Sequence, residues 1–137
     1  MLRLVSAIAN GGVAPEFRLI SGQGTALLSF IDAMEHRGDR SERLVSSAIS
    51  EQMTAMMDYN VYSNYGDGNF PGLELCAKSG TAEVGGDKAP HSWFVGFITN
   101  EEYPLAFVVV AENGGSGVGT AGRIANTVLQ SAIAGGE

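Results

Sequence analysis

The sequence predicts an α+β fold: an antiparallel sheet of about three core strands plus a hairpin, flanked by an N-terminal and a C-terminal helix. Two nearly continuous apolar runs, residues 92–99 and 105–112, are typical of central strands that are covered on both faces. A mixed run over residues 73–83 precedes them and is typical of an edge strand. A helical apolar pattern closes the chain, so helices and strands segregate along the sequence.

Length and charge limit the possible classes of protein. At 137 residues, with 45% hydrophobic residues, the chain suits one domain with a substantial core. Its formal charge of −7 has the wrong sign for neutralising phosphates, so we expect no nucleic-acid partner. The longest apolar run, Leu105 to Ala111, is far shorter than the roughly 20 residues that span a bilayer. We therefore expect a soluble polypeptide.

The N-terminal segment predicts a short amphipathic helix and then a hairpin. Glycines at positions 11 and 12 form the expected C-cap of the helix. Apolar segments on both sides of "SGQG" predict a hairpin over residues 17–31, and the charged stretch from Met34 to Ser41 predicts an exposed loop. The apolar positions of the helix are Leu4, Val5, Ile8 and Ala9.

A second helix follows, and its first residue is ambiguous in the sequence. Asp39, Ser46 and Ser47 are each suitable N-caps. One stripe at helical spacing predicts core packing in preference to an adaptable binding groove. Its members are Ile49, Met53, Met56 and Met57.

The C-terminal half predicts an antiparallel connection, a glycine-rich turn and a last helix. The short "NEEYP" segment joins the second and third strands antiparallel. "GGSGVG" superficially resembles a phosphate-binding loop, but it lacks the Walker lysine, so we interpret it as a tight turn. The last helix has a stripe that predicts packing on the sheet. Its members are Ala121, Ile124, Ala125, Val128, Leu129, Ala132 and Ile133.

Residues 78–81, "KSGT", form the candidate site. Because side chains alternate along a strand, Ser79 and Thr81 share one face while Lys78 and Gly80 share the other. Gly80 lets a ligand backbone approach closely. Such an edge can pair with an extended peptide by strand addition while the hydroxyls and the ammonium group hold a carboxylate. Taken alone, the same four residues fit an exposed lysine before a turn much better than a binding site.

Four ordered segments add context to this edge. They are "ANGG", "AKSGTAE", "HSWFVGFI" and "FVVVAENGGSG", the last followed by the C-terminal helix. Together they resemble the C-terminal part of the transpeptidase domain of penicillin-binding proteins, most closely the class B, monofunctional type. The resemblance covers essentially all of residues 1–137 and is weakest over residues 16–46. It implies a partial penicillin-binding transpeptidase fold.

The resemblance also implies roles for residues 78–81. Serine acyltransferases of this kind share the motifs S-x-x-K, S-x-N and K-[ST]-G, and "KSG" matches the third. The resemblance makes Lys78 and Thr81 catalytic: Lys78 as an electrostatic partner near the nucleophile, and the Thr81 N–H as one of two oxyanion-hole donors. It makes Ser79, Gly80 and Thr81 the residues that hold the carboxylate end of a stem peptide or β-lactam. No cofactor and no metal are expected.

The sequence departs from the family in one important respect. Leu75 stands three positions before Lys78 and Gly85 three before Lys88, so there is no S-x-x-K, and no serine stands two positions before an asparagine. Acyl transfer needs the nucleophile and its base within hydrogen-bond reach of each other. We therefore expect the C-terminal fragment of a transpeptidase domain, inactive alone, whose helical part with S-x-x-K and S-x-N is absent.

Three functions remain open on the sequence. The first is a fragment of a peptidoglycan D,D-transpeptidase that cross-links stem peptides and binds penicillin, which "ENGGSG" and the tryptophan strand favour. The second is a fragment of a β-lactam sensor or serine β-lactamase, and the third is a non-catalytic peptide-binding module. The resemblance further implies a bacterial parent protein at the cell membrane, with its catalytic domain outside the cytoplasm.

The last predicted strand carries one further expectation. In the family's sheet, the resemblance implies, this strand pairs with an N-terminal strand that is missing from the chain. The apolar edge from Leu105 to Glu112 then has unpaired backbone groups, which favour self-association. We expect a homodimer or larger assembly through this edge, unless the 17–31 hairpin covers it.

Overall fold

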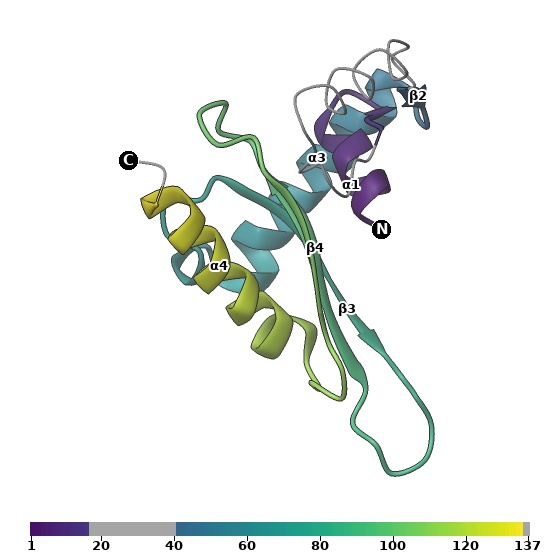
Figure 1. Cartoon of the computed structure of the whole chain (residues 1–137), viewed down its shortest axis with the longest axis vertical. Helices are drawn as coiled ribbons and strands as arrows, with labels where there is room; N and C mark the ends of the chain where they lie inside the picture. The colour runs from purple at the N-terminus through teal and green to yellow at the C-terminus, as the bar shows by residue number, and fades with distance from the viewer. Residues whose placement is uncertain (17–40, 136–137) are drawn as a thin grey trace, which may run out of the picture.

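The computed structural model describes residues 1–16 and 41–135 (Figure 1). The predicted hairpin over residues 17–31 lies outside the described residues, as does all of the predicted charged loop except Ser41. The described chain contains helices, a two-stranded antiparallel sheet and a three-stranded antiparallel sheet. This confirms the α+β class.

The N-terminal helix α1 spans Leu2–Ala9, and its C-cap is Asn10, directly before the predicted glycines. The Gly12 N–H donates to the carbonyl of Ala7 at 2.7 Å, and Gly11 and Gly12 have φ values of 58° and 94°, which favour glycine. The chain then enters β1 (Val13–Ala14), which pairs antiparallel with β2 (Glu42–Arg43).

Helix α3 spans Ser47–Asn60, and Ser46 is its N-cap. The Ser46 Oγ accepts a hydrogen bond from the Ile49 N–H at 3.3 Å, which settles the ambiguous helix start. The helix contacts the rest of the molecule through Ser50 and Met57, which are both buried and lie seven residues apart on one face.

The predicted methionine stripe of α3 is only partly correct. Met57 is buried and Met53 packs against the core, but Ile49 and Met56 are exposed. Each of these two residues precedes a buried one by a single position, which turns it about 100° round the helix and out of the contact. The prediction that all four side chains pack in the core is therefore wrong for Ile49 and Met56.

The three-stranded sheet has the order β3–β4–β5, with all neighbours antiparallel. Its strands are β3 (Leu75–Ala82), β4 (His91–Ile98) and β5 (Ala106–Ala111), close to the three predicted runs. The antiparallel β4–β5 connection is confirmed. β4 is central and mostly buried, as predicted, whereas β5 is mostly half-buried and Val110 is exposed. The prediction that β5 is a covered central strand is wrong for the described chain, where its outer edge pairs with no strand.

The C-terminal helix α4 (Arg123–Ala134) follows a π-helical segment, η3 (Gly117–Gly122). Ala121, Ala125 and Leu129 are buried at every fourth position, and Ile133 packs beside them. The broader predicted stripe is wrong at three positions, because the helix meets the sheet along this single ridge. The exposed members are Ile124, Val128 and Ala132.

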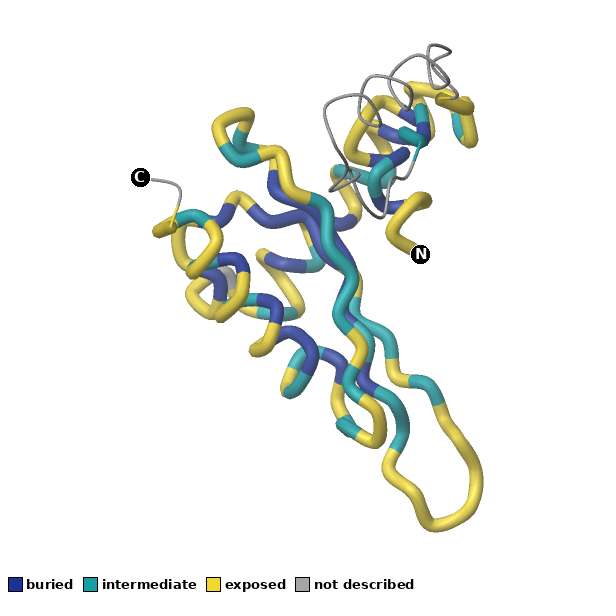
Figure 2. The backbone as a smooth tube through the Cα atoms, viewed as in Figure 1, coloured by how far each residue is buried: buried dark blue, intermediate teal, exposed yellow. Residues whose placement is uncertain are grey.

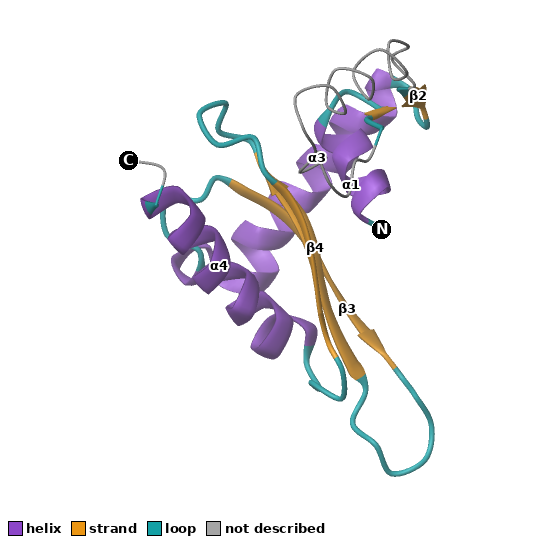
Figure 3. Ribbon diagram, in the orientation of Figure 1, coloured by secondary structure: helices purple, strands orange, loops and turns teal. Residues whose placement is uncertain are grey.

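The sheet lies between two helical layers (Figure 3). On one face, β3 and β4 pack against α4 around Phe94, which is fully buried. The Phe94 ring stacks on Phe70 and Phe107 at centroid distances of 5.4 and 5.9 Å. On the other face, Cys76, Val95 and Phe97 pack against α1 and α3, a second core cluster that includes Val5, Ile8 and Met57. The two layers hold β3 with one long edge free of strand partners in the described chain.

Candidate substrate-binding edge

Residues 78–81 are the fourth to seventh residues of β3, whose far edge points away from β4. Ser79, Gly80 and Thr81 stand opposite Phe94, Trp93 and Ser92, respectively. Ser79 and Thr81 continue the face of Leu75 and Ala77, which packs toward α4, whereas Lys78 and Gly80 continue the face of Cys76. The predicted division of the four side chains between the two faces is confirmed.

The four residues are more accessible to solvent than the first three residues of the strand. β3 begins with three buried residues, and Lys78 and Thr81 are exposed while Ser79 and Gly80 are half-buried (Figure 2). The prediction of an edge strand is confirmed within the described ranges, where β3 pairs only with β4. The side chains of Lys78 and Thr81 are therefore accessible from solvent along this edge. We call residues 78–81 the ligand edge.

The backbone of Ser79 faces outward from the sheet. Its N–H donates to the hydroxyl of Tyr65 at 2.8 Å, and its carbonyl accepts a hydrogen bond from Lys78 Nζ at 2.6 Å. Because outward and inward residues alternate along an edge strand, the N–H of Thr81 also points away from β4. The Lys78 ammonium and the Thr81 N–H thus lie on the same open side of the strand.

The segment η3 supports the ligand edge from one face. A Cβ on Gly117 would lie 2.8 Å from the Gly80 carbonyl oxygen and 3.0 Å from Ser79 Cβ, so only glycine allows this close approach. The glycine-rich turn that resembles a phosphate loop therefore has a packing role here. The sequence did not reveal that role, because no local pattern says which strand a turn will contact.

A buried serine fixes η3 in this position. The Ser92 hydroxyl lies 2.8 Å from the Ser116 carbonyl and 3.3 Å from the Gly117 carbonyl, and it accepts a hydrogen bond from the Ala121 N–H at 3.0 Å. Ser92 also stands directly opposite Thr81. The only sequence signal for this role is that a polar residue, Ser92, opens the apolar run "SWFVGFI".

The single cysteine, Cys76, is buried and chemically unreactive. Burial raises the pKa of the Cys76 thiol to about 11, and the negative charge of Asp58 adds to the shift. At neutral pH the residue is therefore a neutral core thiol rather than a nucleophile.

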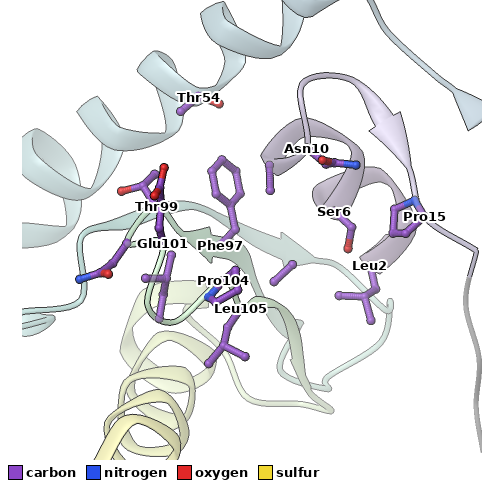
Figure 4. A pocket seen from close by; sticks show the side chains of 14 residues that line it. Leu2, Ser6, Asn10, Pro15, Thr54, Phe97, Thr99, Glu101, Pro104 and Leu105 are labelled. Atoms are coloured by element: carbon purple, nitrogen blue, oxygen red, sulfur yellow. The ribbon is translucent and has the colours of Figure 1, made fainter. Parts of the chain in front are cut away.

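A cavity of about 740 Å³ lies between α1 and the β4–β5 hairpin (Figure 4). Leu2 and Ser6 line it from α1, and Phe97, Pro104 and Leu105 line it from the hairpin. None of residues 78–81 lines this cavity, so it is separate from the ligand edge. No group of three or more His, Cys, Asp or Glu side chains within residues 1–16 and 41–135 could hold a metal ion. In the same ranges no helix is both long and apolar enough to cross a bilayer.

The fold and the ligand edge together define a partial α+β domain that presents a K-S-G-T strand at an open sheet edge. Comparison with known proteins supplies its family. The family model described as the penicillin-binding protein transpeptidase domain matches residues 1–130. The chain therefore belongs to the penicillin-binding protein transpeptidase family, as the sequence predicted.

Individual relatives agree with this assignment. The chain is 28% identical to the peptidoglycan D,D-transpeptidase PbpA of Mycobacterium tuberculosis, over 96% of this chain and 28% of the relative. An imipenem acyl-enzyme complex of M. tuberculosis penicillin-binding protein A superposes with a TM-score of 0.73 at 25% identity, over 96% of this chain and 29% of that one. The D,D-transpeptidase domain of a peptidoglycan glycosyltransferase from Eggerthella lenta gives 0.72 at 26% identity, over 96% and 30%. The chain thus spans less than a third of the length of these relatives.

Proposed function

We propose that this chain supplies the substrate-binding strand of a peptidoglycan D,D-transpeptidase that cross-links stem peptides and binds penicillin. The observation that carries the proposal is the open edge of β3, where Lys78, Ser79 and Gly80 match the family's K-[ST]-G motif and Thr81 follows it. The relatives' names as D,D-transpeptidases favour this function over a β-lactam sensor or hydrolase. A non-catalytic peptide-binding module remains the alternative from another class.

Each residue of the ligand edge has a proposed role. The hydroxyls of Ser79 and Thr81 hold the carboxylate of the stem peptide or β-lactam, and Lys78 adds positive charge beside them. The outward Thr81 N–H is one of two oxyanion-hole donors, and loss of one such donor typically lowers kcat by about 100- to 1,000-fold. Gly80 keeps the strand surface clear of a side chain, so that the ligand backbone can lie close.

The attacking serine and its base belong to other polypeptide. The sequence contains neither S-x-x-K nor S-x-N, so we propose that residues 1–137 are the C-terminal part of a transpeptidase domain and do not become acylated alone. The parent protein is proposed to lie at the bacterial cell membrane with its catalytic domain outside the cytoplasm.

A nuclear magnetic resonance titration of the ¹⁵N-labelled chain tests the ligand edge. An acyl-D-Ala-D-Ala dipeptide should shift the amide resonances of residues 78–81, and the same dipeptide with a C-terminal amide should bind about tenfold more weakly, because the charge-assisted contacts are lost. Lys78→Ala should weaken binding of the acid, whereas Lys88→Ala in the exposed β3–β4 loop should not. Equal binding of acid and amide, or shifts confined to other surfaces, would contradict the proposal.

We also propose that the outer edge of β5 mediates self-association with a second copy of the chain. β5 carries no charged residue, Val110 is 43% exposed, and the described chain provides no strand partner for the outer edge. Sedimentation should therefore show a dimer or larger species, and Val110→Lys should shift it toward monomer, because lysine disfavours edge pairing. A monomeric wild-type chain in which residues 17–31 lie far from residues 105–112 would contradict this proposal without affecting the ligand edge.

A further inference from the structure

Both backbone groups of Ser79 are already occupied. Its N–H donates to the Tyr65 hydroxyl and its carbonyl accepts from Lys78 Nζ, at 2.8 and 2.6 Å. A ligand strand forms its main-chain hydrogen bonds with the outward residues of an edge, which here are Ser79 and, two positions on, Thr81. In the free chain, Ser79 is therefore closed to strand addition and Thr81 is open to it.

Tyr65 is held in place by contacts on both its ring and its backbone. It lies in the π-helical segment η1 (Val61–Gly66), which follows α3 directly. Its ring packs edge-on against the buried Phe94, with a centroid distance of 5.6 Å and an interplanar angle of 63°. Its carbonyl accepts a hydrogen bond from Asn69 Nδ2 at 2.7 Å. The hydroxyl thus stands against the β3 edge as a positioned group rather than as a loose side chain.

This placement limits how a peptide can lie on the edge. The preceding outward residue of this edge is covered, since Ala77 is buried and Tyr65 stands beside Ser79. Lys78 Nζ lies 2.6 Å from the Ser79 carbonyl oxygen, so its positive charge attracts a carboxylate to this position of the edge. A peptide with its carboxylate there has to extend past Thr81 toward Ala82, so it runs antiparallel to β3.

We propose that Tyr65 is the end stop of the ligand edge: it closes the edge at Ser79, so that only a peptide whose chain terminates in a carboxylate at that point fits. The proposal rests on the proposed function of the ligand edge, and it adds a specificity-determining residue outside residues 78–81. Tyr65 contributes by occupying the space that the next residue of a longer peptide would need.

Amide hydrogen exchange tests the Tyr65 contact without a ligand. The Ser79 amide should exchange slowly in the wild-type chain and about three- to tenfold faster in Tyr65→Phe, which keeps the ring against Phe94 but removes the acceptor. Tyr62→Phe, an exposed residue of the same segment, is the matched control and should leave Ser79 unchanged. Unchanged exchange at Ser79 in Tyr65→Phe would overturn the proposal.

Binding of two peptides tests the end stop itself. Two peptides are compared: acyl-D-Ala-D-Ala and the same peptide extended by a C-terminal glycine. Each is titrated into the wild-type chain and into Tyr65→Ala, Tyr65→Phe and Tyr62→Phe. The amide chemical shifts of residues 80–82 report binding. Wild type and Tyr62→Phe should prefer the shorter peptide by about tenfold or more, and Tyr65→Ala should lose most of that preference. If Tyr65→Ala does not fold, Tyr65→Phe still tests the proposal. It frees the Ser79 N–H from the Tyr65 hydroxyl, which should lower the preference for the shorter peptide about threefold.

The outcomes separate the two proposals. Wild type that binds both peptides equally at residues 80–82 overturns the end stop and leaves the ligand edge standing. A preference that persists unchanged in both Tyr65 variants also overturns the end stop. Absence of binding of either peptide to the wild-type chain overturns the ligand edge, and the end stop with it.

Discussion

Ser92→Ala removes the hydroxyl that fixes η3 behind the ligand edge. The Ala121 N–H, which donates to Ser92 Oγ at 3.0 Å, then has no acceptor, and Ala121 is fully buried, so water cannot replace it. The Ser116 carbonyl keeps its hydrogen bond from the Thr120 N–H at 3.1 Å. The unsatisfied Ala121 N–H is therefore the main destabilising effect of the substitution. An unsatisfied buried donor costs about 1–3 kcal/mol, and we expect the free energy of unfolding to fall by about 2 kcal/mol.

Urea unfolding measures this change through the midpoint, with the slope m unchanged if the denatured state is unaffected. Ser131→Ala is the matched control, because Ser131 is exposed and its hydroxyl donates to the Thr127 carbonyl within the same helix. That control should stay within about 0.5 kcal/mol of wild type. In Ser92→Ala the exchange of the Ala121 amide should also accelerate. A Ser92→Ala chain as stable as the Ser131→Ala chain would refute the idea that Ser92 fixes η3.

Three further predictions concern the sheet and its buried groups. Gly96→Ala should destabilise the chain by about 3 kcal/mol or prevent folding, because the new Cβ would lie 2.3 Å from the Cys76 carbonyl oxygen. The control Gly68→Ala places its Cβ in open space and should change the stability little. The midpoints of urea unfolding measure both changes. The free energy of unfolding should fall by about 1.4 kcal/mol per pH unit as the pH rises from about 9 to about 11. The reason is that the unfolded chain loses the Cys76 proton at a lower pH than the folded chain does. Unfolding of Cys76→Ala over the same range should lack this component, and an equal pH dependence would contradict it. Phe94→Ala should lower the free energy of unfolding by about 3–5 kcal/mol, since three aromatic rings pack on this side chain. A decrease below about 1 kcal/mol in calorimetry would count against the central place of Phe94 in the core.

The sequence predicts the strands and the two faces of residues 78–81 well, because both follow from local periodicity. Alternation along a strand is fixed by backbone geometry, so Ser79 and Thr81 had to share a face once the strand was assigned. The glycine stop of α1 was equally local, since positive φ values at Gly11 and Gly12 favour glycine.

The parts that the sequence did not predict depend on contacts between distant segments. Helical periodicity placed Ile49 and Met56 on an apolar stripe, but it could not say how narrow the contact of α3 would be. The Tyr65–Ser79 hydrogen bond joins residues 14 positions apart across a turn-rich loop, and no pattern in "YSNYGDGNFPG" indicates which side chain reaches the strand. The approach of Gly117 to Ser79 depends in the same way on how the last turn crosses the sheet.

Covalent labelling by fluorescent penicillin tests most directly whether this chain binds the substrate while other polypeptide attacks it. The 137-residue chain alone should remain unlabelled. The same chain joined in frame to the part of a penicillin-binding transpeptidase domain that carries S-x-x-K and S-x-N should become labelled at the S-x-x-K serine. Lys78→Ala should lower the labelling rate, and Lys88→Ala should leave it unchanged. Labelling of the isolated chain, or a Lys78→Ala fusion that labels as fast as its parent, would contradict the account.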